Sequence, residues 1–225
     1  MTAIARLISN ELSEDLQWRE EELAIMKKQL VISPSGGLQE KTLLRANLAM
    51  VYAHYEGFCK FALEVYIDAL EKLQLKRKDL KWPLAAYSLA GLHKHLLAES
   101  DRTTFFTCVL NDLDQSLNEV ATYERPGQIS NLWPDLLKQW LARLDLSSCY
   151  VTSERVLLES LVNNRNQIAH GKKLMVSSRS ELDKYAHVAM LAMHEVAIGI
   201  VESLEKKAYQ RHSIVHTIVS HSPSS

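Results

Sequence analysis

The sequence predicts an all-α protein, a helical bundle with a long central helix and additional short helices. Apolar residues recur at spacings of three and four along several segments, and no segment sustains the alternation of apolar and polar residues that marks a strand. Hydrophobic residues make up 47% of the 225 residues, with only seven glycines and five prolines. This composition suits one compact domain. We expect that domain over residues 1–210, followed by a flexible tail over residues 211–225.

Breaks in the apolar pattern divide the chain into helices. An amphipathic first helix runs from Ile4 to Leu30 and stops at residues 33–37, where Pro34 lacks an amide donor. The next segment, residues 39–73, is apolar around much of its circumference and is expected at the centre of the bundle. Further helices are predicted over residues 84–98, 103–120, 135–144, 153–170 and 180–209.

The last predicted helix contains the most apolar stretch of the chain. His187, His194 and Glu195 interrupt it, and such side chains are costly in hydrocarbon. The sequence therefore predicts a buried helix and no membrane span.

Charge and cysteine content limit the classes of function. The formal net charge is −1, so no global field draws the chain to nucleic acid or to an acidic membrane, and any site for a polyanion must be local. The three cysteines are widely separated, which fits reduced thiols better than a disulfide framework. The first residues do not form the apolar core of a secretion signal. We therefore expect a cytoplasmic protein.

The segment Arg165–Gly171 concentrates groups that can act on a phosphate. Gly171 suits the left-handed conformation common after a helix C-terminus. At about 100° per residue, Asn166 and His170 lie about 40° apart, whereas Arg165 is about 140° from His170. Arginine can hold phosphate oxygens bidentately and histidine can transfer protons near neutral pH. The set therefore suits attack of a ribose 2′-hydroxyl on the adjacent phosphate, which needs no metal or other cofactor.

Simpler interpretations exist for this and other patterns. A pair such as Arg165 and His170 can also be a capping arginine and a hydrogen-bonded histidine at a helix end. Asp183, His187 and His194 fall on one stripe and could serve a metal hydrolase, but no cysteine or second carboxylate completes the set, and polar residues on a solvated face explain them as well. The basic residues 76–78, with Lys81, could touch a phosphate backbone or form a solvated turn.

Arg165-Asn166 followed by Ala169-His170-Gly171, late in an all-helical chain, resembles the HEPN superfamily of nucleotide-binding proteins. The hallmark of that superfamily is an arginine, usually a polar residue next, and a histidine after four to six intervening positions. The stretches at residues 18–23, 44–46 and 51–60 look like its MAE-type nuclease group. The resemblance spans most of the chain, from the first helix to about Glu205.

The resemblance implies a homodimeric helical bundle in which two Arg-His motifs face each other across a composite cleft. It implies a metal-independent endoribonuclease in which Arg165 stabilises the phosphate, His170 transfers protons and Asn166 orients either group. A role as a toxin with a cognate antitoxin, or in phage defence, is also implied. The alternative is a non-catalytic module that binds nucleotide or RNA, or that serves only in dimerisation.

Further candidate residues surround the motif. The RNA-binding or supporting candidates are Arg45, Glu56, Lys172 and Lys173. Arg45, Tyr52 and Glu56 share one face of the central helix, so Arg45 and Glu56 could either serve the site or form a structural ion pair. Because the arginine and the histidine of the motif diverge around their helix, one protomer is expected to form only half of a site.

Overall fold

The computed structural model describes residues 1–127, 131–173, 176 and 178–211. Within these ranges the regular structure consists of nine α-helices and one short 3-10 helix, and only isolated β-bridges occur, with no strand. The predicted all-α class is confirmed. Of the predicted tail, only Arg211 lies in the described part of the chain, where its amide donates to the carbonyl of Asp79 at 2.9 Å.

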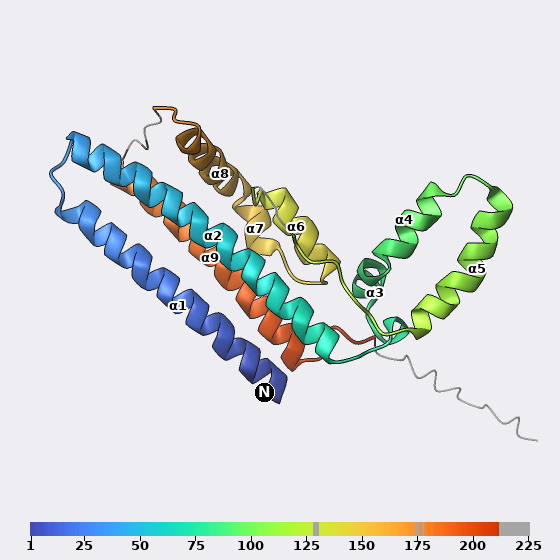
Figure 1. The fold of residues 1–225 in the computed structure, drawn as a ribbon. Helices are drawn as coiled ribbons and strands as arrows, with labels where there is room; N and C mark the ends of the chain where they lie inside the picture. The colour runs from blue at the N-terminus through green and yellow to red at the C-terminus, as the bar shows by residue number, and fades with distance from the viewer. Residues whose placement is uncertain (128–130, 174–175, 177, 212–225) are drawn as a thin grey trace, which may run out of the picture.

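Three long helices lie side by side and form the bundle (Figure 1): α1 (Ala3–Ile32), α2 (Leu38–Lys72) and α9 (Arg179–Glu205). Helix α2 contacts both α1 and α9, and its buried residues run along almost its whole length. This central position agrees with the apolar circumference read from the sequence.

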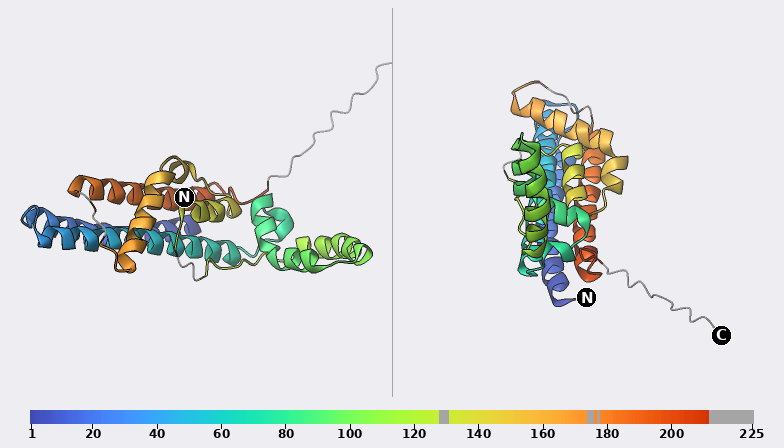
Figure 2. Two further views of the ribbon diagram at one scale, coloured as in Figure 1. Left: turned by 90° about the horizontal axis from the view of Figure 1, so that it is seen from above. Right: turned by 90° about the vertical axis from the view of Figure 1, so that its right-hand side faces the viewer.

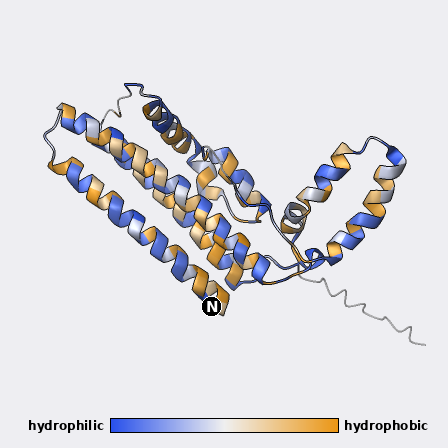
Figure 3. Cartoon of the chain, in the orientation of Figure 1, coloured by the Kyte–Doolittle hydropathy of each residue, from blue (hydrophilic) through white to orange (hydrophobic). Residues whose placement is uncertain are grey.

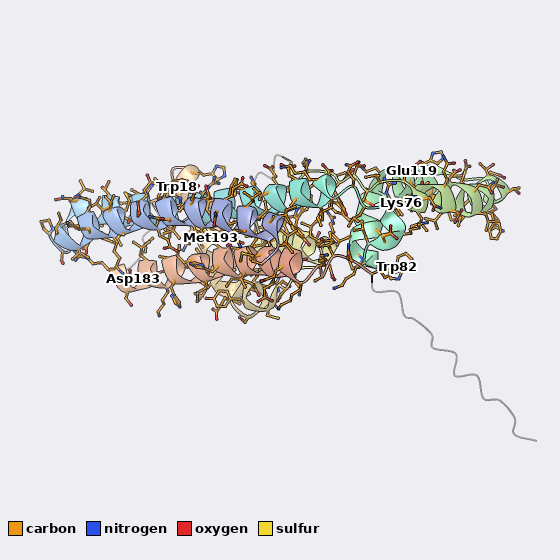
Figure 4. All side chains as sticks on the ribbon, turned by 90° about the horizontal axis from the view of Figure 1, so that it is seen from below. Trp18, Lys76, Trp82, Glu119, Asp183 and Met193 are labelled. Carbon is orange, nitrogen blue, oxygen red and sulfur yellow. The ribbon has the colours of Figure 1, made fainter. Side chains whose placement is uncertain are left out.

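Helix α9 is long and apolar enough to cross a membrane by length and composition, yet half of its most apolar window is buried inside the bundle. Met193 on α9 is fully buried and lies between α1 and α9 (Figure 4). The helix ends at Glu205 rather than at residue 209, and Lys207 adopts a φ of 51° just beyond. Its packing is that of a core helix.

A second layer covers α2 and α9 on the side away from α1 (Figure 1). It contains α6 (Pro134–Arg143), α7 (Cys149–Ser153) and α8 (Arg155–Ala169). The helix predicted over residues 153–170 corresponds to α8, and Glu154, with φ −99° and ψ 16°, separates it from the short α7, which the sequence did not predict. The candidate motif remains on α8.

The predicted helix over residues 84–98 is wrong, because the chain turns at Leu89 (φ −99°, ψ 16°). Helix α3 (Trp82–Ser88) packs against α6, whereas α4 (Ala90–Ala98) turns away and pairs with α5 (Arg102–Asn118). Helices α4 and α5 form an arm that projects along the long axis of the bundle (Figure 2). None of their residues is buried.

A basic turn fixes the base of this arm. Arg77, in the 3-10 helix η1 (Arg77–Asp79), is buried and donates to the hydroxyl of Ser88 at 3.0 Å and to the carbonyl of Ser116 at 2.9 Å. Its guanidinium also pairs with Glu119 at 3.2 Å, and Lys76 lies close to Glu119 in Figure 4. Arg77 is therefore neither a solvated residue nor one available to RNA.

Candidate functional site

The motif lies at the C-terminal end of α8, which buried Leu158, Leu161 and Val162 anchor in the bundle. The amide of His170 donates to the carbonyl of Asn166 at 3.0 Å and closes the last turn. Gly171 has a φ of 71°, the left-handed conformation expected from the sequence. The chain therefore leaves the helix directly after His170.

The guanidinium of Arg165 is held against the bundle. Its Nη1 donates to Oδ1 of Asn131 at 3.1 Å and to Oδ1 of Asn166 at 3.0 Å. Its Cζ lies 4.5 Å from the centre of the Tyr52 ring, within the range of a cation–π contact. No acceptor in the described ranges takes a hydrogen bond from Nε or Nη2. One nitrogen is thus bound to protein, and the opposite edge faces no described partner.

His170 is exposed at the end of α8, and its side chain makes no hydrogen bond to any residue that the structure describes. Asn166 was expected to orient either Arg165 or His170, and in the structure its side chain contacts Arg165. The structure therefore brings Arg165 and Asn166 together, and joins neither side chain to His170 within one protomer.

Tyr52 links the arginine to the core of the bundle. Its hydroxyl accepts a hydrogen bond from the amide of Leu132 at 3.0 Å, and Glu56 on the same helix pairs with Lys60. Burial raises the pKa of Tyr52, and the neighbouring Glu56 carboxylate raises it further. The hydroxyl therefore stays protonated and fixes the ring under Arg165.

The remaining candidates separate into two groups. Nη1 of Arg45 donates to the carbonyl of Lys172 at 2.9 Å, so Arg45 ties α2 to the segment that follows α8. Glu56 pairs with Lys60, and the possible ion pair between Arg45 and Glu56 is not formed. The side chains of Lys172 and Lys173 are exposed beside the motif.

Sequence reasoning missed the part played by Tyr52 and missed Asn131 altogether. Tyr52 could be placed only on a face of the central helix. Asn131 stands in a loop 34 positions before Arg165, and no local spacing connects the two residues. Only the packing of α8 on α2 and α6 brings them together.

A second polar cluster joins α1 to α2 and contains Asp15, Trp18, Arg19, Glu22 and His54. Nε of Arg19 donates to Asp15 at 2.6 Å, and its Nη1 lies 3.5 Å from Nδ1 of His54. Nε2 of His54 approaches Glu22 at 2.9 Å without the alignment of a hydrogen bond. Burial lowers the pKa of His54, while the charge of Glu22 opposes that shift. Trp18 lies at the surface of this cluster (Figure 4).

The residues considered for a metal hydrolase do not converge. In the described ranges no group of three or more histidine, cysteine, aspartate or glutamate side chains could hold a metal ion. Asp183 pairs with Lys27 at 2.8 Å, and His194 pairs with Glu20 at 3.0 Å. These contacts give the metal-hydrolase alternative no support.

Comparison with known proteins identifies a family. The family model described as MAE_28990-like HEPN matches residues 8–209, which include the polar cluster between α1 and α2 and the motif on α8. No curated protein and no solved structure matches the chain.

Proposed function

The chain belongs to the MAE_28990-like HEPN family, and on this premise we propose that it is a metal-independent endoribonuclease. The observation that carries the proposal is the arrangement of Arg165. Asn131 and Asn166 hold its Nη1, while Nε and Nη2 meet no acceptor in the described part of the chain. A guanidinium with one edge available can bind two phosphate oxygens at once.

The reaction needs one proton acceptor, one proton donor and a cation. His170 takes the proton from the ribose 2′-hydroxyl, the oxygen bonds to phosphorus, and the bond from phosphorus to the 5′ oxygen breaks. The leaving oxygen takes up a proton, so the products are a 2′,3′-cyclic phosphate and a 5′-hydroxyl. Arg165 stabilises the charge that develops on the phosphate oxygens.

A second copy of the chain completes the site in this proposal. One protomer carries Arg165 against the bundle and His170 at the exposed helix end, with nothing described that joins them. Two motifs face each other across a homodimer, so that Arg165 of one copy acts with His170 of the other, and Lys172 and Lys173 add positive charge for RNA. We place the enzyme in the cytoplasm, as a toxin restrained by an antitoxin or as a phage-defence nuclease. Toxicity on expression that requires His170, and that the product of a neighbouring gene relieves, tests this role.

Cleavage of single-stranded RNA in EDTA tests the activity. The wild type is expected to cut, and His170→Ala is expected to cut about 10²- to 10⁴-fold more slowly while remaining folded by circular dichroism. His187→Ala is the matched control, because His187 is also an exposed histidine on a helix. Undiminished cutting by His170→Ala would overturn the assignment. Loss of activity in EDTA or in His187→Ala would favour a metal hydrolase.

A non-catalytic RNA-binding module is the second candidate, favoured by the absence of any described side chain that orients His170. It predicts that the wild type and His170→Ala bind RNA with equal affinity and that neither cuts any RNA of a broad set.

A further inference from the structure

The contacts around Arg165 form a connected support that reaches from α8 through α2 to the loop before α6. Tyr52 is 1% exposed, so its ring is a fixed surface under the guanidinium. The hydroxyl of the same residue holds the amide of Leu132. Leu132 directly follows Asn131, whose side chain accepts from Arg165. One tyrosine therefore fixes both the face of the guanidinium and the backbone that carries its hydrogen-bond partner.

We propose that Tyr52 and Asn131 are positioning residues that set Arg165 for phosphate, an inference that rests on the proposed function. An exposed arginine has many rotamers, and ordering it on each encounter with substrate costs entropy. Here the ring of Tyr52 fixes the plane of the guanidinium, and Asn131 together with Asn166 fixes its rotation about the Nε–Cζ axis. Nε and Nη2 then stay on the edge opposite to these acceptors.

Glu56 and Lys60 support Arg165 indirectly, because Glu56 lies next to Tyr52 and neither residue is hydrogen-bonded to Arg165 in the described part of the chain. The Glu56 carboxylate accepts from Lys60 and lies near the Tyr52 hydroxyl, where it helps to keep that hydroxyl protonated. Glu56 therefore acts through Tyr52, and contact of Glu56 with RNA is not part of its role.

The kinetic test compares Asn131→Ala and Tyr52→Phe with the wild type. We expect kcat to fall about 10- to 100-fold in each variant, because a displaced guanidinium loses alignment with the phosphate. KM for RNA should change by less than about threefold, because RNA binding depends on many other contacts. Tyr55→Phe is the matched control: Tyr55 lies on the same helix, is fully buried, and its hydroxyl has no hydrogen-bond partner among the described residues. It should leave kcat unchanged.

Non-additivity separates positioning from general damage to the fold. In an Arg165→Ala background, adding Asn131→Ala should reduce the residual activity no further, because the group that it positions is already absent. A further loss of about tenfold, or a wild-type kcat in both Asn131→Ala and Tyr52→Phe, would overturn the inference. Thermal unfolding of every variant confirms that only folded protein is compared.

A readout independent of cleavage distinguishes failure of this inference from failure of the proposed function. NMR of the ¹⁵N-labelled arginine side chains reports the rate of rotation of the Arg165 guanidinium. We expect rotation to be at least about tenfold faster in Asn131→Ala than in the wild type and Tyr55→Phe. Equal rotation rates in Asn131→Ala and the wild type would contradict the positioning role of Asn131, even if the enzyme cuts RNA. If rotation is slow in the wild type and fast in Asn131→Ala but the protein cuts no RNA, the nuclease proposal is wrong and the positioning inference stands.

Discussion

At the scale of single residues, Arg19 places a positive charge in the buried interface between α1 and α2. Its side chain is 11% exposed, and Asp15 accepts from it at 2.6 and 3.3 Å. The backbone of α2 makes room at Gly57, where a Cβ atom would stand 2.9 Å from Nη1 of Arg19. The arginine and the glycine therefore fit together across the two helices.

Removing the carboxylate that pairs with Arg19 should destabilise the fold strongly. Asp15→Ala leaves a buried guanidinium without its counter-ion, and we expect a loss of about 3 kcal/mol in the free energy of unfolding. Glu14→Ala, at an exposed neighbouring position, should change it by no more than about 0.5 kcal/mol. Urea unfolding measures both, and similar values for the two variants would show that the pair with Arg19 adds no stability.

His54 should make the stability depend on pH. Burial and the charge of Arg19 lower the pKa of His54 in the folded protein, while Glu22 and Asp15 oppose the shift. The folded state thus binds fewer protons than the unfolded state. The stabilisation is fully present above the ordinary histidine pKa of about 6.5 and is lost as the pH falls through the lowered folded pKa.

Tm should therefore fall more steeply in the wild type than in His54→Gln between about pH 7 and about pH 5. Differential scanning calorimetry at several pH values measures both slopes. Parallel curves would mean that His54 does not contribute to the acid sensitivity.

The candidate site shows which residues a sequence can and cannot reveal. The common placement of Arg165, Asn166 and His170 at one helix end could be predicted, because helical geometry fixes their relative directions. The contact between Asn131 and Arg165 could not, because it depends on how the loop before α6 is tied to Tyr52.

At the scale of the elements, the arm formed by α4 and α5 differs from the bundle. Leu97 is 74% exposed, Phe106 63% and Leu110 61%, and apolar residues recur along both helices in Figure 3. The ion pair between Arg77 and Glu119 fixes only the base of this arm. The arm therefore has few buried contacts to oppose local opening.

Hydrogen exchange should separate the arm from the central helix. Backbone amides of α4 and α5 should exchange faster than those in the middle of α2, because local unfolding of the arm exposes little buried surface. Mass spectrometry of peptic fragments measures this difference. Equal protection in the two regions would show that the arm is covered in solution.

The ends of the helices were predictable where a specific residue type enforces them. Pro34 separates α1 from α2, and Pro134 occupies the first turn of α6. The breaks at Leu89 and Glu154 contain neither proline nor glycine. At Leu89 the two successive helices pack against different neighbours, α3 against α6 and α4 against α5, so tertiary packing overrides local helix preference there.

At the scale of the whole molecule, the proposed site requires two copies of the chain. If Arg165 of one copy acts with His170 of the other, the inactive variants Arg165→Ala and His170→Ala should complement each other. Random mixing makes about half of the dimers mixed, each with one intact site, so about one quarter of wild-type activity should return. Coexpression with two affinity tags and an RNA cleavage assay measure this. A mixture as inactive as either variant alone would contradict a composite site.

The chemistry of cleavage offers the most direct test of the nuclease proposal. The wild type is incubated in EDTA with an RNA whose cleavage site has been mapped, and with the same RNA carrying one 2′-deoxynucleotide on the 5′ side of the cut bond. Attack by the 2′-hydroxyl predicts a 2′,3′-cyclic phosphate from the first RNA and no cutting of that bond in the second. Cutting of the substituted bond would contradict the mechanism assigned to Arg165 and His170.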